Sequence, residues 1–404
     1  MMHPFVNKYR SLFIRLVSTI LSIFRLKRFS VLKVLFFIFE FPVEILGDIV
    51  FLYKRIFPKT FINPHKILIV RIDRMGDVLF STSLVSSIKE IYPHCQIDYV
   101  INPQSKDVLL GNPYVSNIFY WTDPIFQVAS PRGRKTTSFL RVFISAFRVI
   151  KILRNNEYDY LINGRALLPS SNFWWFLVRA KRLISFDISG QSFFSDSWAR
   201  YDLKNEEWEN YNNLLLPLKT NRNTPGTPLF FNFNDTIFDS VALQKLKDRK
   251  YFVCAPVSFD KNKQWNADYW GEVLRFCISA GNAIVLTGES HQKEYLKQIR
   301  NFIQDPDDVM VVTDASVAKL ASLYRESVGF LGIESFPAHL ALTLKKHIFC
   351  SMNYVMYYFK GMSRSFSSLS ARSMLPRDPF VHTFSIHDSP GAVISLLEKS
   401  GLVR

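Results

Sequence analysis

Residues 66–79 read Lys66-Ile67-Leu68-Ile69-Val70-Arg71-Ile72-Asp73-Arg74-Met75-Gly76-Asp77-Val78-Leu79, a short apolar run followed by Gly-Asp and a second apolar segment. This pattern predicts a buried strand at 66–72 and a helix from Val78 to about Ile91. In an open parallel sheet, ligands bind beyond the carboxyl ends of the strands, where the N-terminus of a following helix adds positive potential. The sequence therefore places the carboxylate of Asp77 where a catalytic acid or base could lie.

Asp77 also has a purely structural interpretation. Asp is a common N-cap residue, and a lone Gly-Asp after a strand more often caps the next helix than performs chemistry. Asp73 is a second candidate for the base, although a carboxylate still within the end of the strand is expected to be structural. Residues 71–79 alone leave these interpretations open.

Two alternations of strand-like and helix-like segments follow one another along the chain, a pattern typical of parallel sheets covered by helices. The first predicts elements at 66–72, 78–91, 96–101, 139–154 and 160–162. The second predicts elements at 251–256, 267–280, 283–287, 309–312, 316–326, 327–332, 337–344, 346–350 and 392–399. We expect the Trp-rich residues 170–211 to form irregular loops, and residues 219–228, with two prolines and a glycine, to link two domains.

The composition is basic, and the excess charge is concentrated near the N-terminus. The chain has 404 residues and a formal net charge of +16, of which residues 1–60 carry +7, with ten Lys and Arg against three Asp and Glu. A basic surface suits nucleic acid, anionic lipid or a phosphorylated substrate. The four cysteines form no Cys-x-x-Cys pair, which argues against a zinc site or a disulfide framework and favours a reducing cytosol.

The first sixty residues have the pattern of membrane-associating helices. In residues 8–25 nearly every position is apolar except for polar residues three or four positions apart, which predicts a helix with one polar stripe; they are Lys8, Ser11, Arg15, Ser18, Ser22 and Arg25. Residues 31–53 contain four charged residues and a proline, so no charge-free run approaches the ~20 apolar residues of a membrane span. We expect residues 1–60 to lie on an anionic membrane surface, or alternatively to pack on the globular body. The first thirty residues lack a small-residue cleavage site, so we expect no secretory signal.

Two distant groups of residues together suggest a family. The first comprises residues 71–79, Ser83-Leu84, Tyr92-Pro93 and Gly111-Asn112-Pro113. The second comprises Lys263-Gln264-Trp265, Tyr269-Trp270 and Gly332-Ile333-Glu334-Ser335-Phe336-Pro337-Ala338-His339-Leu340-Ala341. The first group resembles the opening of the family 9 glycosyltransferases, the heptosyltransferases of lipopolysaccharide core assembly. The second resembles the Lys-x-Trp element and the Gly-x-Asp-Ser/Thr-Gly-Pro-x-His-Leu-Ala signature of the same family. The resemblance covers roughly residues 65–385.

The resemblance implies an α/β protein with the GT-B fold, in which two Rossmann-like domains face each other across a cleft. The expected parts are membrane-associating helices at 1–60, an acceptor domain at 65–218, a nucleotide-sugar domain at 229–385 and a C-terminal helix at 386–404. For inverting transfer, the resemblance assigns to Asp77 the base that removes the proton of the acceptor hydroxyl. Gly76 and Arg165 are weaker candidates for acceptor contacts, since an isolated basic residue such as Arg165 is more often a solvated surface residue.

On the donor side, the resemblance implies that Lys263 and the helix start at Glu334-Ser335-Phe336 bind the diphosphate. A lysine and a helix N-terminus can stabilise this leaving group in place of a metal, so we expect neither a metal nor a cofactor. His339 could bind a phosphate or ribose hydroxyl, or it could simply pack in the core. Trp265 could likewise be a core residue rather than part of the donor site. Thr287 and Gly288 resemble a position near the nucleotide base.

Two departures from the family signature affect the expected function: Glu334 stands where the family has Asp, and Phe336 stands where it has Gly. The expected protein is a peripheral glycosyltransferase on the cytoplasmic face of the inner membrane, moving a heptose from ADP-heptose onto a lipid-linked saccharide such as lipopolysaccharide core. The alternative is a degenerate, non-catalytic member that binds a nucleotide or glycolipid. A nucleic-acid-binding protein is the remaining rival, but no RNA-binding or helix-turn-helix signature supports it, and we expect no nucleic-acid partner.

Overall fold

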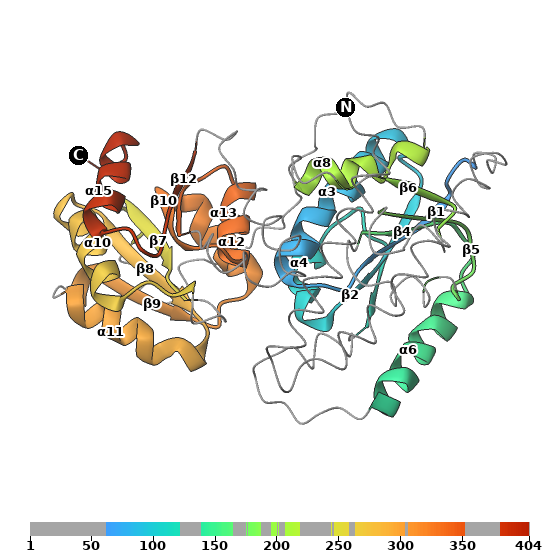
Figure 1. Cartoon of the computed structure of the whole chain (residues 1–404), viewed down its shortest axis with the longest axis horizontal. Helices are drawn as coiled ribbons and strands as arrows, with labels where there is room; N and C mark the ends of the chain where they lie inside the picture. The colour runs from blue at the N-terminus through green and yellow to red at the C-terminus, as the bar shows by residue number, and fades with distance from the viewer. Residues whose placement is uncertain are drawn as a thin grey trace, which may run out of the picture.

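The computed structural model describes residues 62–121, 139–164, 175, 177–186, 195–199, 201, 207–218, 244, 246–257, 263–303, 306–351 and 380–403. These residues form two lobes, each built on a six-stranded sheet (Figure 1). The predicted membrane segment at 1–60, the predicted linker at 219–228 and Arg165 lie outside the described residues.

The first lobe has the strand order β3-β2-β1-β4-β5-β6, and all neighbouring strands are parallel. Its strands are β1 (Lys66–Arg71), β2 (Gln96–Ile101), β3 (Asn117–Tyr120), β4 (Tyr158–Asn163), β5 (Ala180–Phe186) and β6 (Ser197–Ala199). Its helices are α3 (Met75–Ile91), α4 (Lys106–Leu109), α6 (Phe139–Arg154) and α8 (Glu207–Asn213), with 3-10 turns η1 (Pro103–Ser105) and η3 (Leu216–Leu218). The apolar β1 is central because it pairs with β2 on one side and β4 on the other.

The second lobe has the strand order β12-β11-β10-β7-β8-β9, again fully parallel. Its strands are β7 (Tyr251–Ala255), β8 (Ala283–Gly288), β9 (Val309–Thr313), β10 (Gly329–Ile333), β11 (His347–Ser351) and β12 (Val381–Phe384). Its helices are α10 (Ala267–Ser279), α11 (Lys293–Ile303), α12 (Val317–Glu326), α13 (Phe336–Thr343) and α15 (Pro390–Lys399), with 3-10 turns η5 (Ser290–Gln292) and η6 (Pro306–Asp308). Val393 and Leu397 of α15 are buried in this lobe's core.

The two sheets share one topology. When the strands of each lobe are numbered from one to six along the chain, both sheets read 3-2-1-4-5-6. In such a sheet the order of successive strands reverses between strands one and four, and ligands bind beyond the carboxyl ends at this switch point. In the first lobe the switch point lies between β1 and β4, and in the second between β7 and β10.

The lobes meet through helices at their facing edges. Figure 1 shows α3 and α4 of the first lobe beside α12 and α13 of the second, in agreement with the contacts between these elements. One buried hydrophobic cluster includes Leu79 and Phe80 of α3 together with Ala338 and Leu340 of α13. The helices that follow β1 and β10 therefore share part of their core.

Two expectations from the sequence need correction. The helix after β1 begins at Met75 rather than Val78, because Arg74 is the N-cap and Gly76 and Asp77 already have helical geometry. Residues 170–211 are not irregular throughout, since they contain β5, β6 and the beginning of α8. The strand β5 was not predicted because it begins with polar residues. In the structure one of them, Lys181, forms an ion pair of 2.8 Å with Asp159. Elements at β3, β12 and α11 were not expected either. None of the helices in the described ranges combines the length and apolar character needed to span a bilayer.

Candidate active site

The carboxylate of Asp77 lies beyond the carboxyl end of β1, in the first turn of α3. Its Oδ1 atom is 2.9 Å from Nη2 of Arg71, the last residue of β1. Arg71 is buried, lies 3.1 Å from Asp73 through Nη1, and donates a hydrogen bond to the carbonyl of Gly164. The strand end therefore presents one guanidinium that orients two carboxylates. Asp77 is not the helix cap, because the N-cap is Arg74.

Asp77 and Asp73 differ in their exposure. The Asp77 side chain is 30% exposed, whereas that of Asp73 is almost fully buried beside Arg71. Desolvation raises the pKa of Asp77 above its ordinary value, and the neighbouring Asp73 acts in the same direction, while Arg71, His339 and Arg74 oppose them. Asp77 is accessible and its pKa is raised, which suits a proton acceptor, whereas the Asp73 side chain is too buried to meet an acceptor hydroxyl.

The second lobe contributes Lys263, which a buried tryptophan holds in place. Trp265 packs edge-on against Trp270, with ring centroids 5.0 Å apart, and its Nε1 donates to the carbonyl of Asp388 at 3.2 Å. The hydroxyl of Tyr295 donates to the Trp265 carbonyl. Trp265 is thus a core residue that anchors the loop after β7, so that Lys263 two positions earlier is directed to the end of β10.

Lys263 meets Glu334, the first residue after β10. The Lys263 Nζ and Glu334 Oε2 atoms are 2.7 Å apart, and the lysine side chain is 18% exposed. The other carboxylate oxygen, Oε1, is 3.5 Å from Nε2 of His339. Burial alone would raise the pKa of Glu334, but His339 and Lys263 together hold it well below its ordinary value. Glu334 is therefore an anion placed between the two side chains expected to bind diphosphate.

The start of α13 differs in part from the expectation. The backbone N–H of Glu334 donates to the Ser351 carbonyl at 3.1 Å, and the Ser335 hydroxyl donates to the Ile333 carbonyl at 3.2 Å. Both donors therefore already have hydrogen-bond acceptors within the protein. Pro337 supplies no N–H group. Phe336 is not strained: among the described non-glycine residues, only Asp314 and Lys345 have positive φ. Its half-buried side chain packs against the shared core cluster.

His339 brings the two lobes together. Its ring contacts Phe80 of α3 edge-on, with centroids 4.8 Å apart. A Cβ atom built on Gly76 would lie only 2.9 Å from the Cδ2 atom of His339, so the residue before Asp77 must be small. The Nδ1 atom of His339 is buried and makes no hydrogen bond to any residue of the described part of the chain. The His339 side chain therefore packs between the lobes and still has a ring nitrogen that could bind a ligand.

The remaining expected site residues lie apart from this group. Thr287 is buried at the end of β8, where its hydroxyl donates to the Cys254 carbonyl at 3.3 Å. A Cβ atom on Gly288 would approach Leu296, Gln292 and Val257 to between 3.1 and 3.2 Å, so this glycine permits close packing. Within the described ranges, no group of three or more His, Cys, Asp or Glu side chains is placed to hold a metal ion.

Two residues of the site received no role from the sequence. Arg71 stands in the quoted strand, and the signal was its charge at the last position of an otherwise apolar run. Phe80 gave no signal, because an apolar residue in a helix is expected in the core. The structure thus brings Gly76 and Asp77 of the first lobe to His339 of the second, and His339 to Glu334 and Lys263.

Two facing Rossmann-like lobes, with the site at their switch points, define the protein as an α/β protein of the GT-B class. A family model described as glycosyltransferase family 9 (heptosyltransferase) matches residues 146–349, half of the chain. The chain therefore belongs to glycosyltransferase family 9 and is a glycosyltransferase that uses a nucleotide sugar. The matched region contains Lys263, Glu334 and His339 but not Asp77.

Individual relatives are distant in sequence and similar in fold. Lipopolysaccharide heptosyltransferase 3 of Escherichia coli is 21% identical over 285 residues, which cover 66% of this chain and 77% of that protein. The solved structure of E. coli heptosyltransferase WaaC with ADP-2-deoxy-2-fluoro heptose is 15% identical, with a TM-score of 0.64 over 83% of this chain and 99% of that one. E. coli ADP-heptose lps heptosyltransferase II is 14% identical, with a TM-score of 0.61 over 83% and 98%.

Proposed function

We propose that this glycosyltransferase moves a heptose from ADP-heptose onto a lipid-linked saccharide, such as lipopolysaccharide core, with inversion at the anomeric carbon. The names of the relatives support this choice of donor and acceptor. The observation that carries the proposal is the contact of the helix bearing Asp77 with His339, which lies beside Glu334 and Lys263. A candidate base and a candidate diphosphate site thus lie on opposite sides of one interface.

In the proposed reaction Asp77 accepts the proton of the acceptor hydroxyl while that oxygen attacks the anomeric carbon. The bond from this carbon to the diphosphate oxygen breaks in the same displacement, which inverts the configuration. Arg71 is a positioning residue, since its guanidinium lies against Oδ1 of Asp77 at 2.9 Å. Raising the pKa of the carboxylate makes it a stronger base, at the cost of protonation at acidic pH.

The departing ADP takes up negative charge, which Lys263 would stabilise as a point charge together with the N-terminus of α13. In the structure Lys263 is paired with Glu334 at 2.7 Å. Donor binding therefore requires that the diphosphate replace the Glu334 carboxylate, or share the lysine with it. A cation supplied by the protein supports the proposal that no metal is required. His339 offers its buried Nδ1 atom to a phosphate or ribose oxygen.

The expected location is the cytoplasmic face of the inner membrane, with the amino-terminal segment on anionic lipid. This segment lies outside the described residues, and its basic, apolar composition supports the proposal. An acceptor anchored in lipid would be reached by an enzyme held at that surface.

The test combines donor binding with product analysis. Thermal shifts with ADP-, GDP- and UDP-sugars identify the nucleotide, because a ligand that binds only the folded state raises its stability. We expect ADP-heptose to give the largest shift, transfer to continue in EDTA, and NMR of the product to show the inverted anomer. Retention of configuration, loss of activity in EDTA or preference for another nucleotide would each contradict a part of the proposal.

A non-catalytic member of the family is the second candidate, and the Lys263–Glu334 ion pair favours it. Glu334 is one methylene longer than the aspartate of the family signature, which lets its carboxylate reach the lysine that would otherwise bind diphosphate. This candidate predicts binding of nucleotide or glycolipid without any turnover or donor hydrolysis by the full-length protein.

A further inference from the structure

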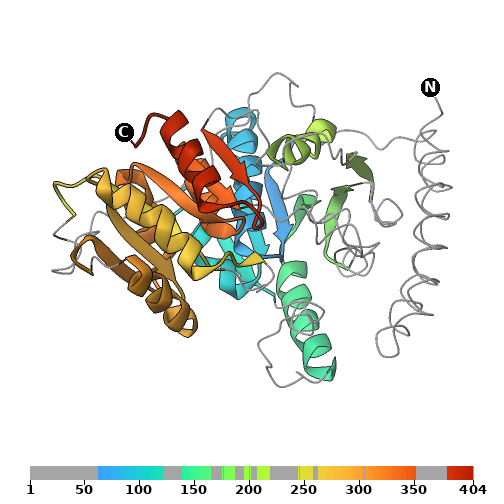
Figure 2. The same ribbon diagram turned by 60° about the vertical axis from the view of Figure 1, so that its left-hand side comes forward.

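Helix α6 (Phe139–Arg154) carries a combination of side chains that the catalytic proposal does not explain. Its sequence contains Arg141, Arg148, Lys151 and Arg154 and no acidic residue. Three of the eight exposed large hydrophobic residues of the described chain lie on this one helix: Ile144, Phe147 and Ile152, which are 43%, 55% and 50% exposed. Figure 1 shows α6 at the edge of the first lobe, away from the second, and Figure 2 shows it projecting from the body of the protein.

The arrangement around the helix explains why these residues remain exposed. Ile150 and Leu153 are buried against the sheet and fix one face of α6. At about 100° per residue, Ile144, Ile152 and Phe147 share the opposite arc, of roughly 160°, with Arg148, Lys151 and Arg154. The exposed arc therefore alternates apolar and cationic side chains. A helix face that met only water would be expected to carry charges of both signs and few large apolar groups.

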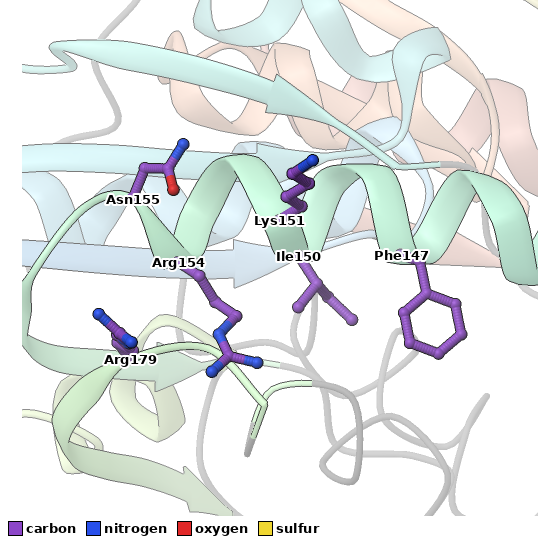
Figure 3. Close-up of a pocket in the computed structure, with 6 residues that line it drawn as sticks. All are labelled: Phe147, Ile150, Lys151, Arg154, Asn155 and Arg179. Atoms are coloured by element: carbon purple, nitrogen blue, oxygen red, sulfur yellow. The ribbon is translucent and has the colours of Figure 1, made fainter.

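A shallow hollow of about 320 Å³ continues this arc toward the start of β5. It is lined by Phe147, Ile150, Lys151, Arg154, Asn155 and Arg179. Figure 3 shows Phe147, Ile150 and Arg154 pointing to one side of α6, where Arg179 also lies. The acidic residues that follow α6 are Glu157 and Asp159, and Asp159 is already engaged by Lys181 at 2.8 Å. The hollow thus has an apolar floor and a cationic rim.

We propose that the exposed face of α6 docks on an anionic phospholipid bilayer, with Ile144, Phe147 and Ile152 in the interface and the basic residues on lipid phosphates. Apolar side chains between cations are the pattern of helices that lie in the membrane plane. A soluble polyanion would use the cations and leave the apolar groups in water. This surface belongs to the folded first lobe and uses a stretch of sequence other than residues 1–60, and the proposal does not depend on glycosyl transfer.

The decisive measurement reports on α6 itself while the full chain is present. All four cysteines are buried, so an introduced Ile144→Cys provides one reactive thiol for an environment-sensitive NBD probe. We expect a blue shift and a gain in emission with vesicles of phosphatidylglycerol and phosphatidylcholine, and a much smaller response with phosphatidylcholine alone. The matched control is Phe302→Cys, because Phe302 is 47% exposed on α11 of the other lobe. That probe should not respond.

The result overturns the proposal if the protein sediments with anionic vesicles while the probe at position 144 responds no more than the probe at position 302. Absence of binding to anionic vesicles overturns it as well. A response without vesicles that grows with protein concentration would instead mean that a second copy of the chain covers α6.

A charge-matched pair of variants tests the electrostatic part. Replacing Arg148, Lys151 and Arg154 by Gln should weaken vesicle partition by roughly fivefold for each residue. Replacing Lys293, Lys297 and Arg300 of α11 by Gln changes the net charge equally and should have little effect. Circular dichroism confirms that both variants fold. Equal weakening in the two variants would show a general charge effect and contradict docking through α6.

Discussion

His339 of the second lobe lies so close to Gly76 of the first that a methyl group on Gly76 would come within 2.9 Å of the His339 Cδ2 atom. Gly76 precedes Asp77, and His339 lies 3.5 Å from Glu334. The position of the candidate base relative to the candidate diphosphate site therefore depends on a contact that only glycine permits.

The substitution Gly76→Ala should push α3 and α13 apart. We expect a loss of about 1–3 kcal/mol in the free energy of unfolding, the usual cost of overpacking. Turnover should fall by up to about 100-fold, because a displacement of about 1 Å at a reacting centre has effects of that size. Thermal denaturation and steady-state kinetics measure the two changes.

Two further variants make this result specific. Gly391→Ala is the control, since its nearest contact would be Ser389 Oγ at 3.9 Å, and it should change neither quantity. Adding His339→Ala to Gly76→Ala should restore part of the lost stability. If Gly76→Ala leaves stability and turnover unchanged, the lobes do not meet here in solution.

The substitution Asp77→Asn tests the base. It preserves shape and should lower turnover about 100-fold or more, the scale expected for a positioned general base, while donor binding persists. Turnover is measured at saturating donor and acceptor. Asp73→Asn is the control: loss of its ion pair with Arg71 should reduce stability more than turnover. Wild-type turnover in Asp77→Asn would remove Asp77 from the mechanism.

Turnover should fall in acid, with a midpoint above pH 3.8. Burial raises the pKa of Asp77 above that value, and only the carboxylate can accept a proton. The stability effect has the opposite sign. The folded state binds this proton more tightly than the unfolded state, so the contribution of Asp77 is complete below 3.8 and is lost as pH rises through the folded pKa. Parallel pH series of turnover and denaturation, on wild type and Asp77→Asn, separate the two effects.

The variants Lys263→Ala and Glu334→Gln should change ADP binding in opposite directions. Lys263→Ala removes a charge that faces phosphate and should weaken ADP binding about 10- to 100-fold, the range for a hydrogen bond to a charged group, while adenosine is affected less. Glu334→Gln frees the lysine and should strengthen ADP binding. Calorimetry with both ligands measures this. Equal weakening for ADP and adenosine would make Lys263 a structural residue.

Glu334 should also contribute to acid sensitivity of the fold. Its pKa lies below the ordinary 4.5, mainly because His339 and Lys263 outweigh the effect of burial. Its contribution to stability is therefore present above pH 4.5 and is lost as pH falls through the folded pKa. The free energy of unfolding of Glu334→Gln should fall less steeply below pH 4.5 than that of wild type. Identical slopes would show that the carboxylate is solvated in solution.

The sequence was most informative where local pattern and chemistry coincide. The apolar run of β1, its junction with α3 and the motif around Glu334 indicated both lobes and the GT-B class, which the structure and the family match confirm. Domain boundaries and the roles of individual site residues stay predictions. Trp265, for which two roles were open, is a core residue whose hydrogen bond to Asp388 anchors the loop of Lys263.

The features that the sequence did not predict were missed for physical reasons. The start of α3 was placed too late, because Gly76 looks like a helix breaker although His339 requires a small residue there. The strand β5 begins with basic residues, and the partner of one of them, Lys181, is Asp159 on another strand. The contact between Gly76 and His339 joins residues far apart in the chain, and no local periodicity encodes such a contact. Phe336, which stands where the family has Gly, has no positive φ in the structure.

Both sheets have the same strand order, yet the lobes do not meet through equivalent elements. The first lobe contributes α3 and α4, which follow its first and second strands, whereas the second contributes α12 and α13, which flank its fourth strand. Such an interface is heterologous, because each lobe contacts the other through a different set of helices. We expect a chain divided between the lobes to give two halves that pair with each other rather than with copies of themselves, and turnover to return only when both are mixed.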